Sequence, residues 1–185
     1  MMTPDEVLDF WFVGDPAAHR KVWFEKDAEF DAACSRFADA LRDARAGVFD
    51  HWTDTPRGTL ALIVLLDQFS RNLHRGSPEA FAADATALGI ARSAVARGFD
   101  QALGPVERMF VYLPFEHSEN LADQDESVRL CATLREALGE DSIRYGENHR
   151  DVIRRFGRFP HRNTALGRVS TPDELAYLAQ PGAGF

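Results

Sequence analysis

The chain has 185 residues, close to the length of one ordinary domain, and 45% of them are hydrophobic, which is enough to build a buried core. These values exclude a disordered chain. The longest purely apolar run, Leu60 to Leu66, is far shorter than the roughly 20 residues that a membrane-spanning helix needs. Cys34 and Cys131 form no CxxC motif, so we expect neither a disulfide framework nor a zinc site, and a reducing cytosol fits best. We therefore expect one cytoplasmic domain over residues 1–185 that does not contact a membrane.

The net charge of -8 is unevenly distributed along the chain. Residues 140–170 hold seven arginines against four acids, whereas the rest of the chain is strongly acidic. An acidic chain repels a polyanion at long range, so we expect no nucleic-acid partner. A small anionic ligand remains open, because arginine donors suit carboxylates and phosphates.

Helix signals dominate the first half of the chain. Thr3-Pro4-Asp5-Glu6 predicts a helix start, with a hydroxyl cap, a proline at the first helical position and a glutamate at the third. Apolar residues from 30 to 48 recur at three-and-four spacing, which predicts an amphipathic surface helix that ends near Gly47. Residues 57–72 contain the run Leu60 to Leu66, which is apolar on all sides and indicates a helix buried among others.

The second half continues the same pattern. Ser77-Pro78-Glu79 starts a helix that ends at Gly98, and its inward face is expected to carry Phe81, Ala85, Leu88, Ala91 and Val95. Gly104-Pro105 starts the next, helices over 123–138 and 142–156 follow, and Thr171-Pro172-Asp173-Glu174 repeats the first capping device. No segment alternates with period two. We predict an all-α fold of about eight helices, with short loops that make neighbouring helices antiparallel.

Aromatic residues and cysteines are expected in the core. The aromatic residues are Phe10-Trp11-Phe12, Trp23-Phe24 and Trp52. Nothing near Cys34 or Cys131 in the sequence would lower a thiol pKa, so both are expected to be inert. The chain has no dinucleotide fingerprint, P-loop or nucleophile elbow, and we expect no cofactor.

A first polar segment, Asp67-Gln68-Phe69-Ser70-Arg71-Asn72, follows directly on the buried run. Asp67 and Arg71 are four residues apart, and Arg75 lies four beyond Arg71, so they share one side of a helix. A carboxylate at this depth needs a partner, which Arg71 can supply as an ion pair that ties the helix to its neighbours. Alternatively, Arg71 and Arg75 present their donors to a ligand anion.

A second polar segment is Glu116-His117-Ser118-Glu119, just beyond Pro114. Proline at this position removes a hydrogen bond to the carbonyl of Phe110 and is expected to kink or end the helix. A histidine beside carboxylates can serve as a general acid or base, with Glu119 or another acceptor holding His117 in one tautomer. The same residues are typical of a cap or a surface network. They lack the spacing that converges on a metal ion, and we expect no metal site.

A third segment begins in the predicted helix over 142–156, where Tyr145, His149, Ile153 and Phe156 share one face. A histidine such as His149 on an apolar face is usually a satisfied core residue. Arginines then gather around Phe159, Pro160 and His161; they are Arg154, Arg155, Arg158, Arg162 and Arg168. Like charges this close need compensation, either from internal carboxylates such as Asp67, Glu116 and Glu119 or from a ligand anion.

Four motifs in order give the chain a family resemblance. They are Val7-Leu8-Asp9-Phe10-Trp11-Phe12, Leu65-Leu66-Asp67-Gln68-Phe69-Ser70-Arg71-Asn72, Leu113-Pro114-Phe115-Glu116-His117-Ser118-Glu119 and Phe156-Gly157-Arg158-Phe159-Pro160-His161-Arg162-Asn163. Over essentially its whole length the chain resembles the bacterial domain of unknown function family 924. The resemblance implies a tetratricopeptide-like all-α superhelix and no established activity. It carries over the following motif positions, without roles: Asp67, Arg71, Asn72, His117, Ser118, Glu119, Arg158, His161, Arg162 and Asn163.

The leading hypothesis is a pocket between helices that binds a small anionic metabolite. Arg71, Arg75, Arg158 and Arg162 would hold the anion, and the other expected ligand-binding residues are Asp67, Asn72, His149, His161 and Asn163. Whether the protein is an enzyme is left open; if it is, His117 and Glu119 form the candidate acid/base pair, and His161 is a second proton carrier. Two rivals remain. One is a tetratricopeptide-like scaffold that binds a peptide or partner protein, and the other is a set of motifs that only holds a polar core together.

Overall fold

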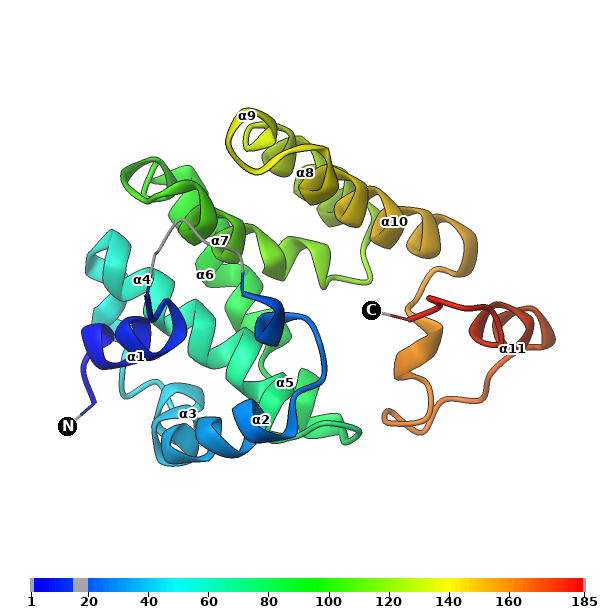
Figure 1. Ribbon diagram of the computed structural model, residues 1–185, viewed down its shortest axis with the longest axis horizontal. Coiled ribbons are helices and arrows are strands. Elements are labelled where there is room, and N and C mark those ends of the chain that lie inside the picture. Colours follow the sequence, from blue (N-terminus) through cyan, green and yellow to red (C-terminus); the bar gives the residue numbers. More distant parts are fainter. Residues whose placement is uncertain (1, 15–19, 185) are drawn as a thin grey trace. The chain divides into compact units, whose positions relative to one another are not determined.

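The computed structural model describes residues 2–14 and 20–184, which fold into helices and turns with no strand among them (Figure 1). The α-helices are α1 (Pro4–Trp11), α2 (Ala28–Cys34), α3 (Ala38–Arg45), α4 (Pro56–Ile63), α5 (Ser70–Leu73), α6 (Asp84–Ala96), α7 (Pro105–Glu116), α8 (Leu121–Ala132), α9 (Arg135–Leu138), α10 (Glu140–Phe156) and α11 (Pro172–Leu178). The 3-10 turns are η1 (Lys21–Trp23), η2 (Ser35–Phe37), η3 (Asp50–Asp54), η5 (Pro78–Phe81), η6 (Asp100–Ala102) and η7 (Pro160–Arg162), and η4 (Val64–Phe69) is π-helical. The all-α prediction is confirmed for the described residues, and the number of long helices is close to the eight expected.

The chain divides into two compact units, each described below by itself. Unit 1 comprises residues 1–75 and 79–114, and unit 2 comprises residues 76–78 and 115–185. The division falls inside α7, directly after Pro114, where the ring removes a backbone hydrogen bond. The helix then ends at Glu116, two residues later, as the proline predicted. The expectation of a single domain stays a prediction.

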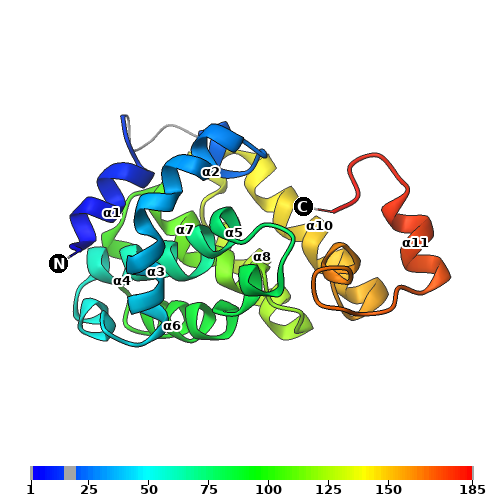
Figure 2. The same cartoon turned by 90° about the horizontal axis from the view of Figure 1, so that it is seen from below.

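The centre of unit 1 is one continuous helical segment made of α4, η4 and α5. The run Leu60 to Leu66 is at most 1% exposed, which confirms the prediction of a helix buried on all sides. Helices α1, α2 and α3 pass in front of this segment in the view of Figure 2, and α6 packs against it as well. The π-helical turn of η4, which the sequence did not predict, contains the buried Asp67 and Gln68.

A close backbone approach explains Gly58 near the start of α4. A Cβ atom at this position would lie 2.3 Å from the carbonyl oxygen of Trp52, far inside contact distance. Only glycine therefore lets η3 pack directly against α4. The side chain of Thr55 caps the same helix by accepting a hydrogen bond from the Gly58 N–H.

Three helix predictions need correction. The helix predicted over 123–138 is two helices, α8 and α9, which are separated at Thr133 and Leu134. The amphipathic segment from residue 30 is two helices, α2 and α3, separated by the 3-10 turn η2, although it does end at Gly47 with φ of +79°. The next helix, α6, starts at Asp84 rather than near Ser77 and buries Ala87, Ala91 and Ala94. Ala85, expected to point inward, is exposed, and the other large members of the predicted face are only half-buried. Small alanines occupy the contact face because they allow α6 to pack closely on α4.

Most of the aromatic residues form the predicted core of unit 1. Trp11 is fully buried and contacts Trp23, Phe69 and Phe110 at ring-centroid distances of 5.2–6.3 Å. Phe24 departs from the prediction because it is 49% exposed.

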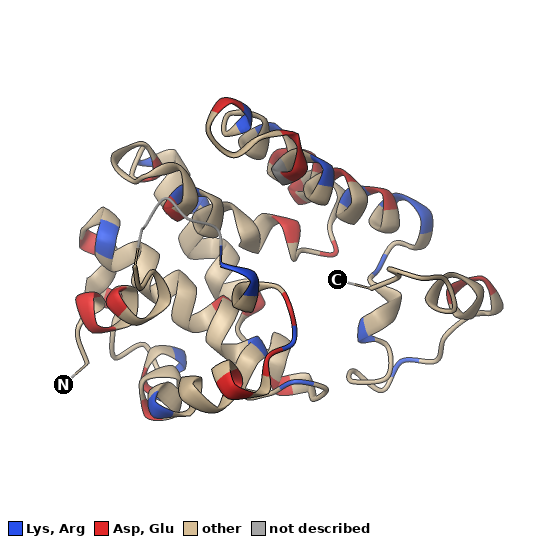
Figure 3. Ribbon diagram, viewed as in Figure 1, with Lys and Arg blue, Asp and Glu red and all other residues tan. Residues whose placement is uncertain are grey.

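Unit 2 is built on α8 and α10, which run antiparallel and side by side with α9 at the turn between them (Figure 1). Acidic and basic residues alternate along α10 (Figure 3). Three of its arginines lie within 4 Å of acids three residues earlier, and Arg150 and Arg154 also reach Asp125 of α8. Much of the positive charge expected in this window is therefore balanced locally. Tyr145, predicted on the buried face, is 61% exposed.

Both cysteines are buried and free, and burial raises the pKa of each thiol to about 12, which agrees with their prediction as inert core residues. Across the described residues no helix is both long and apolar enough to cross a membrane.

Candidate functional site

In unit 1, Asp67 and Arg71 form the predicted ion pair. Asp67 is fully buried in η4, and its Oδ1 lies 3.2 Å from Nη1 of Arg71. Arg71 also binds both carboxylate oxygens of Asp84 on α6, at 2.9 and 3.0 Å. Gln68 donates a further hydrogen bond to Asp67. Arg71 therefore joins two helices through carboxylates of the protein itself.

The remaining predicted residues of this segment, Asn72 and Arg75, both bind Asp31 on α2. Asn72 donates to Oδ1 of Asp31 at 2.7 Å, and Arg75 donates to both carboxylate oxygens at 2.5 and 2.9 Å. Burial raises the pKa of Asp31, but the hydrogen bonds from Arg75 and Asn72 outweigh it and leave that pKa below its usual value. The first polar segment thus connects α2, α5 and α6.

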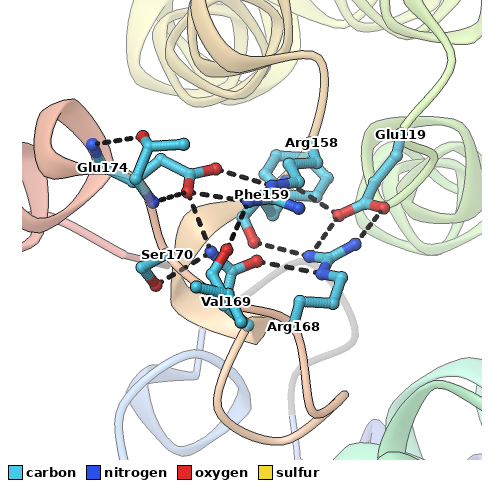
Figure 4. Close-up of polar contacts among 9 residues, drawn as sticks. Glu119, Arg158, Phe159, Arg168, Val169, Ser170 and Glu174 are labelled. Carbon is cyan, nitrogen blue, oxygen red and sulfur yellow. Dashed lines mark hydrogen bonds and ion pairs between the residues drawn. The ribbon is translucent and has the colours of Figure 1, made fainter.

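In unit 2, Glu119 is bound to Arg168 (Figure 4). Its oxygens accept hydrogen bonds from Arg168 at 2.7 and 3.0 Å and from the Phe159 N–H at 2.7 Å. Burial raises the pKa of Glu119, but these hydrogen bonds hold it below its ordinary value. Glu119 is therefore paired bidentately with Arg168, while its predicted partnership with His117 stays a prediction.

A second carboxylate, Glu174 of α11, binds Arg158. Nε and Nη2 of Arg158 donate to it at 2.6 and 2.8 Å, Asn163 donates at 3.2 Å, and the Thr171 N–H donates at 2.8 Å (Figure 4). The Arg158 hydrogen bonds, followed by the Thr171 backbone, lower the pKa of Glu174 to about 2. Arg158, Arg168 and Asn163 are therefore held by internal carboxylates, one of the two alternatives that the sequence left open.

Ser118, a motif position, fixes the turn between α7 and α8. Its hydroxyl donates to Asp123 at 2.7 Å and accepts from the Asn120 N–H at 3.2 Å. Gln124, which the sequence did not single out, donates to the carbonyls of Glu116 and Ser118 at 2.6 and 2.7 Å. These bonds orient the segment that carries His117.

Three histidines from different segments lie close together in unit 2: His149 and His161 contact Phe159, and His117 lies beside His149. His117 and His149 have ring centroids 6.4 Å apart, His149 stands edge-on to Phe159 at 5.7 Å, and His161 lies 5.6 Å from Phe159. The guanidinium carbon of Arg162 lies 4.6 Å from the same ring, and Arg162 is only 6% exposed. We call His117, His149, His161 and Arg162 the histidine cluster.

His149 is the buried member of this cluster, at 6% exposure. Its Nδ1 lies 2.8 Å from the Tyr145 carbonyl oxygen and 3.3 Å from Oε1 of Glu116. A carbonyl oxygen can only accept, so Nδ1 carries the proton of the neutral ring. Burial, reinforced by repulsion from His117, His161 and Arg162, lowers the pKa of His149 to about 3. The ring is therefore neutral at physiological pH, and Glu116 is a neighbour that the sequence identified only as a compensating charge.

The sequence did not identify Glu174 and Arg168 as partners of the site. Glu174 was recognised only as the third residue of a capping box, which the structure confirms for both Thr3 and Thr171. Arg168 was counted among the arginines, but its partner Glu119 is 49 residues away. The sequence did contain a signal for these pairs. Residues 140–170 hold more arginines than acids, so carboxylates from outside that window, such as Glu119 and Glu174, were available to balance the excess charge.

The structure does not bring the four predicted anion-holding arginines together within one unit. Arg71 and Arg75 belong to unit 1, and Arg158 and Arg162 belong to unit 2. Two surface hollows of about 220 and 330 Å³ occur in unit 1, and their walls include none of the predicted site residues. Within the part of the chain that the structure describes, no three or more His, Cys, Asp or Glu side chains are grouped as metal ligands would be.

Comparison with known proteins agrees with the family resemblance. The family model described as bacterial protein of unknown function, DUF924, matches residues 7–182. A solved structure of a protein of unknown function from Agrobacterium tumefaciens, ATU0120, is 41% identical with a TM-score of 0.84, over 95% of this chain and 96% of that chain. No curated protein matches the sequence. Because the family model covers nearly the whole chain, the chain belongs to the bacterial family of unknown function DUF924.

Proposed function

We propose that the histidine cluster of unit 2 binds a small anionic ligand, a carboxylate or a phosphate. The observation that carries this proposal is that His149, His161 and the buried Arg162 all contact Phe159, with His117 beside His149. Arg162 supplies a permanent positive charge, because a guanidinium stays protonated at any physiological pH. Two carboxylates border the cluster: Glu116 lies 3.3 Å from His149, and Arg162 lowers the pKa of Glu119. Because Glu119 is already held by Arg168, we assign the remaining positive potential of Arg162 and the histidines to the bound anion.

The low pKa of His149 supports the sign of this potential. Burial makes the largest contribution, but His117, His161 and Arg162 each lower that pKa further by repulsion. An anion bound at the cluster would offset this repulsion and raise the pKa of His149. His117 and His161 are the half-buried members, and they are the residues that we assign to proton exchange with the ligand.

The other predicted ligand-binding residues have supporting roles in this proposal. Arg158 and Asn163 hold the loop on which His161 and Arg162 stand, through Glu174. Asp67, Arg71, Asn72 and Arg75 connect helices of unit 1. Anion binding thus rests on Arg162 and the histidines rather than on four arginines. The cytoplasmic location that we expect fits two free cysteines.

The test is thermal unfolding at constant ionic strength with inorganic phosphate or succinate, and with chloride as the reference. A ligand at 100 times its dissociation constant adds about 2.7 kcal/mol, which raises the Tm of a protein this size by about 5–10 °C. We expect this rise in wild type and in Arg144→Gln, whose arginine forms an exposed pair with Asp141. It should be lost in His117→Gln and in Arg162→Gln. Equal Tm values in phosphate, succinate and chloride for wild type would refute the proposal.

A tetratricopeptide-like scaffold is the second candidate. The antiparallel pairing of α8 and α10 is the observation that favours it, because such pairs are the repeating unit of helical superhelices (Figure 1). In this reading the helix pairs continue as a superhelix whose groove binds a peptide or a partner protein. A photo-crosslinking amino acid at the exposed Tyr145 of α10 would then capture one discrete polypeptide in cells. Crosslinking only to abundant proteins in proportion to their concentration would count against it.

A further inference from the structure

We propose that the C-terminal strap, defined as residues 172–184, covers the histidine cluster at His161 and controls access to it. The strap comprises α11 and the segment that follows it, and this segment turns back toward η7 (Figures 1 and 2). Control of ligand entry by the strap rests on the proposed anion site. The covering of His161 by the strap can be tested without any ligand.

The first end of the strap is fixed by Glu174. This residue is only 2% exposed and accepts hydrogen bonds from Arg158, Asn163 and the Thr171 N–H (Figure 4). Arg158 also donates to the carbonyl of Val169 at 2.9 Å, so one guanidinium holds both α11, through Glu174, and the segment before it. The result is an ionic latch at the base of the strap.

The far end of the strap lies against His161. A Cβ atom at Gly184 would be 3.2 Å from Cβ and 3.6 Å from Cγ of His161, so the glycine backbone packs on the side chain at closer range than most side chains would allow. Ala183 and Gly184 are half-buried, whereas Pro181 and Gly182 are exposed. The last described residues thus form the contact over the cluster.

The latch and the covered histidine belong to the same loop. Arg158 and Asn163, which bind Glu174, enclose η7, and η7 carries His161 and Arg162. When the strap moves, Glu174 moves with it and leaves Arg158 and Asn163. This movement uncovers His161 and loosens the loop that positions Arg162. One change in position alters both the access to the site and its shape.

The strap is built to open locally. Its half-buried Tyr177 lies 5.2 Å from Phe156 between ring centroids and packs with it on the small buried cluster of Val152, Ile153 and Phe159, whereas Leu175 is 58% exposed. Segments that bury little apolar surface and rely on polar contacts open with a lower free energy than the core. We therefore expect the strap to open while α8 and α10 stay folded.

The experiment measures hydrogen–deuterium exchange at the C2 position of each histidine ring by mass spectrometry, in the full chain without ligand. Glu174→Gln weakens the latch, and Gly184→Ala pushes the tail away from His161 while the latch stays intact. Gly182→Ala is the matched control for the tail, because Gly182 also has a positive φ, +77°, but nothing lies within 4 Å of its added Cβ. Glu126→Gln is the matched control for the latch, since Glu126 forms an exposed pair with Arg129.

We expect exchange at His161 to rise about tenfold in Glu174→Gln and in Gly184→Ala and to stay at the wild-type rate in both controls. His51 and His74 of unit 1 serve as internal references, and their rates should not change. An unchanged His161 rate in Gly184→Ala and Glu174→Gln, with native circular dichroism, would overturn the proposal. A gain equally large in Gly182→Ala would overturn it as well, because the effect would then come from backbone strain alone.

The outcome separates the strap from the anion site. If His161 exchanges faster in the two variants but phosphate and succinate leave the Tm of wild type unchanged, the strap stands and the proposed function fails. If the anions bind and Glu174→Gln and Gly184→Ala leave His161 exchange unchanged, the anion site stands and the strap as its cover fails.

Discussion

Replacement of Glu119 by alanine gives a sharp test of the internal pairing in unit 2. Three hydrogen bonds are lost, from Nη1 and Nη2 of Arg168 and from the backbone N–H of Phe159, a residue with no exposed surface; Nη2 keeps its bond to the Phe159 carbonyl. A buried N–H left without a partner costs about 1–3 kcal/mol. The pair with Arg168 adds about 1 kcal/mol, because its side chains are 22% and 29% exposed and water screens them.

We therefore expect Glu119→Ala to lose about 3 kcal/mol of stability. In a chain of this length that lowers Tm by about 6–12 °C in the transition that includes unit 2. The matched control is Glu126→Ala, which breaks the exposed pair with Arg129 and should cost less than about 1 kcal/mol. Calorimetry at pH 7 measures both.

The pH dependence adds a second, independent readout. The pKa of Glu119 is lower in the folded protein than its ordinary value of 4.5, so its stabilisation is complete above that value and is lost as the pH falls through the folded pKa. The Tm difference between wild type and Glu119→Ala should therefore be largest near neutral pH and shrink below pH 4.5. A Glu119→Ala protein that unfolds within about 2 °C of Glu126→Ala at pH 7 would refute this reasoning.

Three further predictions follow from burial and close packing. Gly58→Ala places its Cβ 2.3 Å from the Trp52 carbonyl oxygen and should lower the free energy of unfolding, measured with urea, by about 3 kcal/mol. The control Gly89→Ala in α6, with open space around its Cβ, should raise it by about 0.5–1 kcal/mol. Equal effects of the two variants would contradict the packing described for α4. Cys34 and Cys131, with thiol pKa values near 12, should react with a disulfide reagent at pH 8 only as fast as the protein opens, and immediate labelling of native protein would contradict their burial. His149 should show no titration between pH 5 and 8 by NMR, because its pKa falls from 6.5 to about 3 on folding. Its burial should therefore lower the stability of the folded protein as the pH drops below 6.5. His149→Gln should remove that part of the acid sensitivity.

Local signals in the sequence predicted the helices well. Both capping boxes were readable because Thr and Glu lie three residues apart, and the buried α4 was readable because its apolar residues surround the helix. The inward face of α6 was not readable in this way. Large side chains carry the strongest hydrophobic signal, but the close contact with α4 is made by alanines.

The partners of the polar residues could not be predicted from spacing. Asp67 and Arg71 are four residues apart in one helical segment, and that pair was identified. Arg158 and Glu174 are 16 residues apart and Arg168 and Glu119 are 49 apart, with a change of chain direction between them. Only the folded arrangement decides which carboxylate reaches which guanidinium, and it pairs Glu119 with Arg168 and Glu174 with Arg158.

The π-helical turn η4 also bears on how the length of this chain can vary. Such a turn holds one residue more than an α-turn between the same flanking helices. Deletion of a single residue within 64–69 would therefore convert it to an ordinary α-turn, and α5 would keep its orientation relative to α4. The same deletion in the middle of α6 would rotate every later residue of that helix by about 100° and expose its alanine face. Among chains of this fold, one-residue gaps in an alignment belong at η4, in the middle of the core rather than only in surface loops.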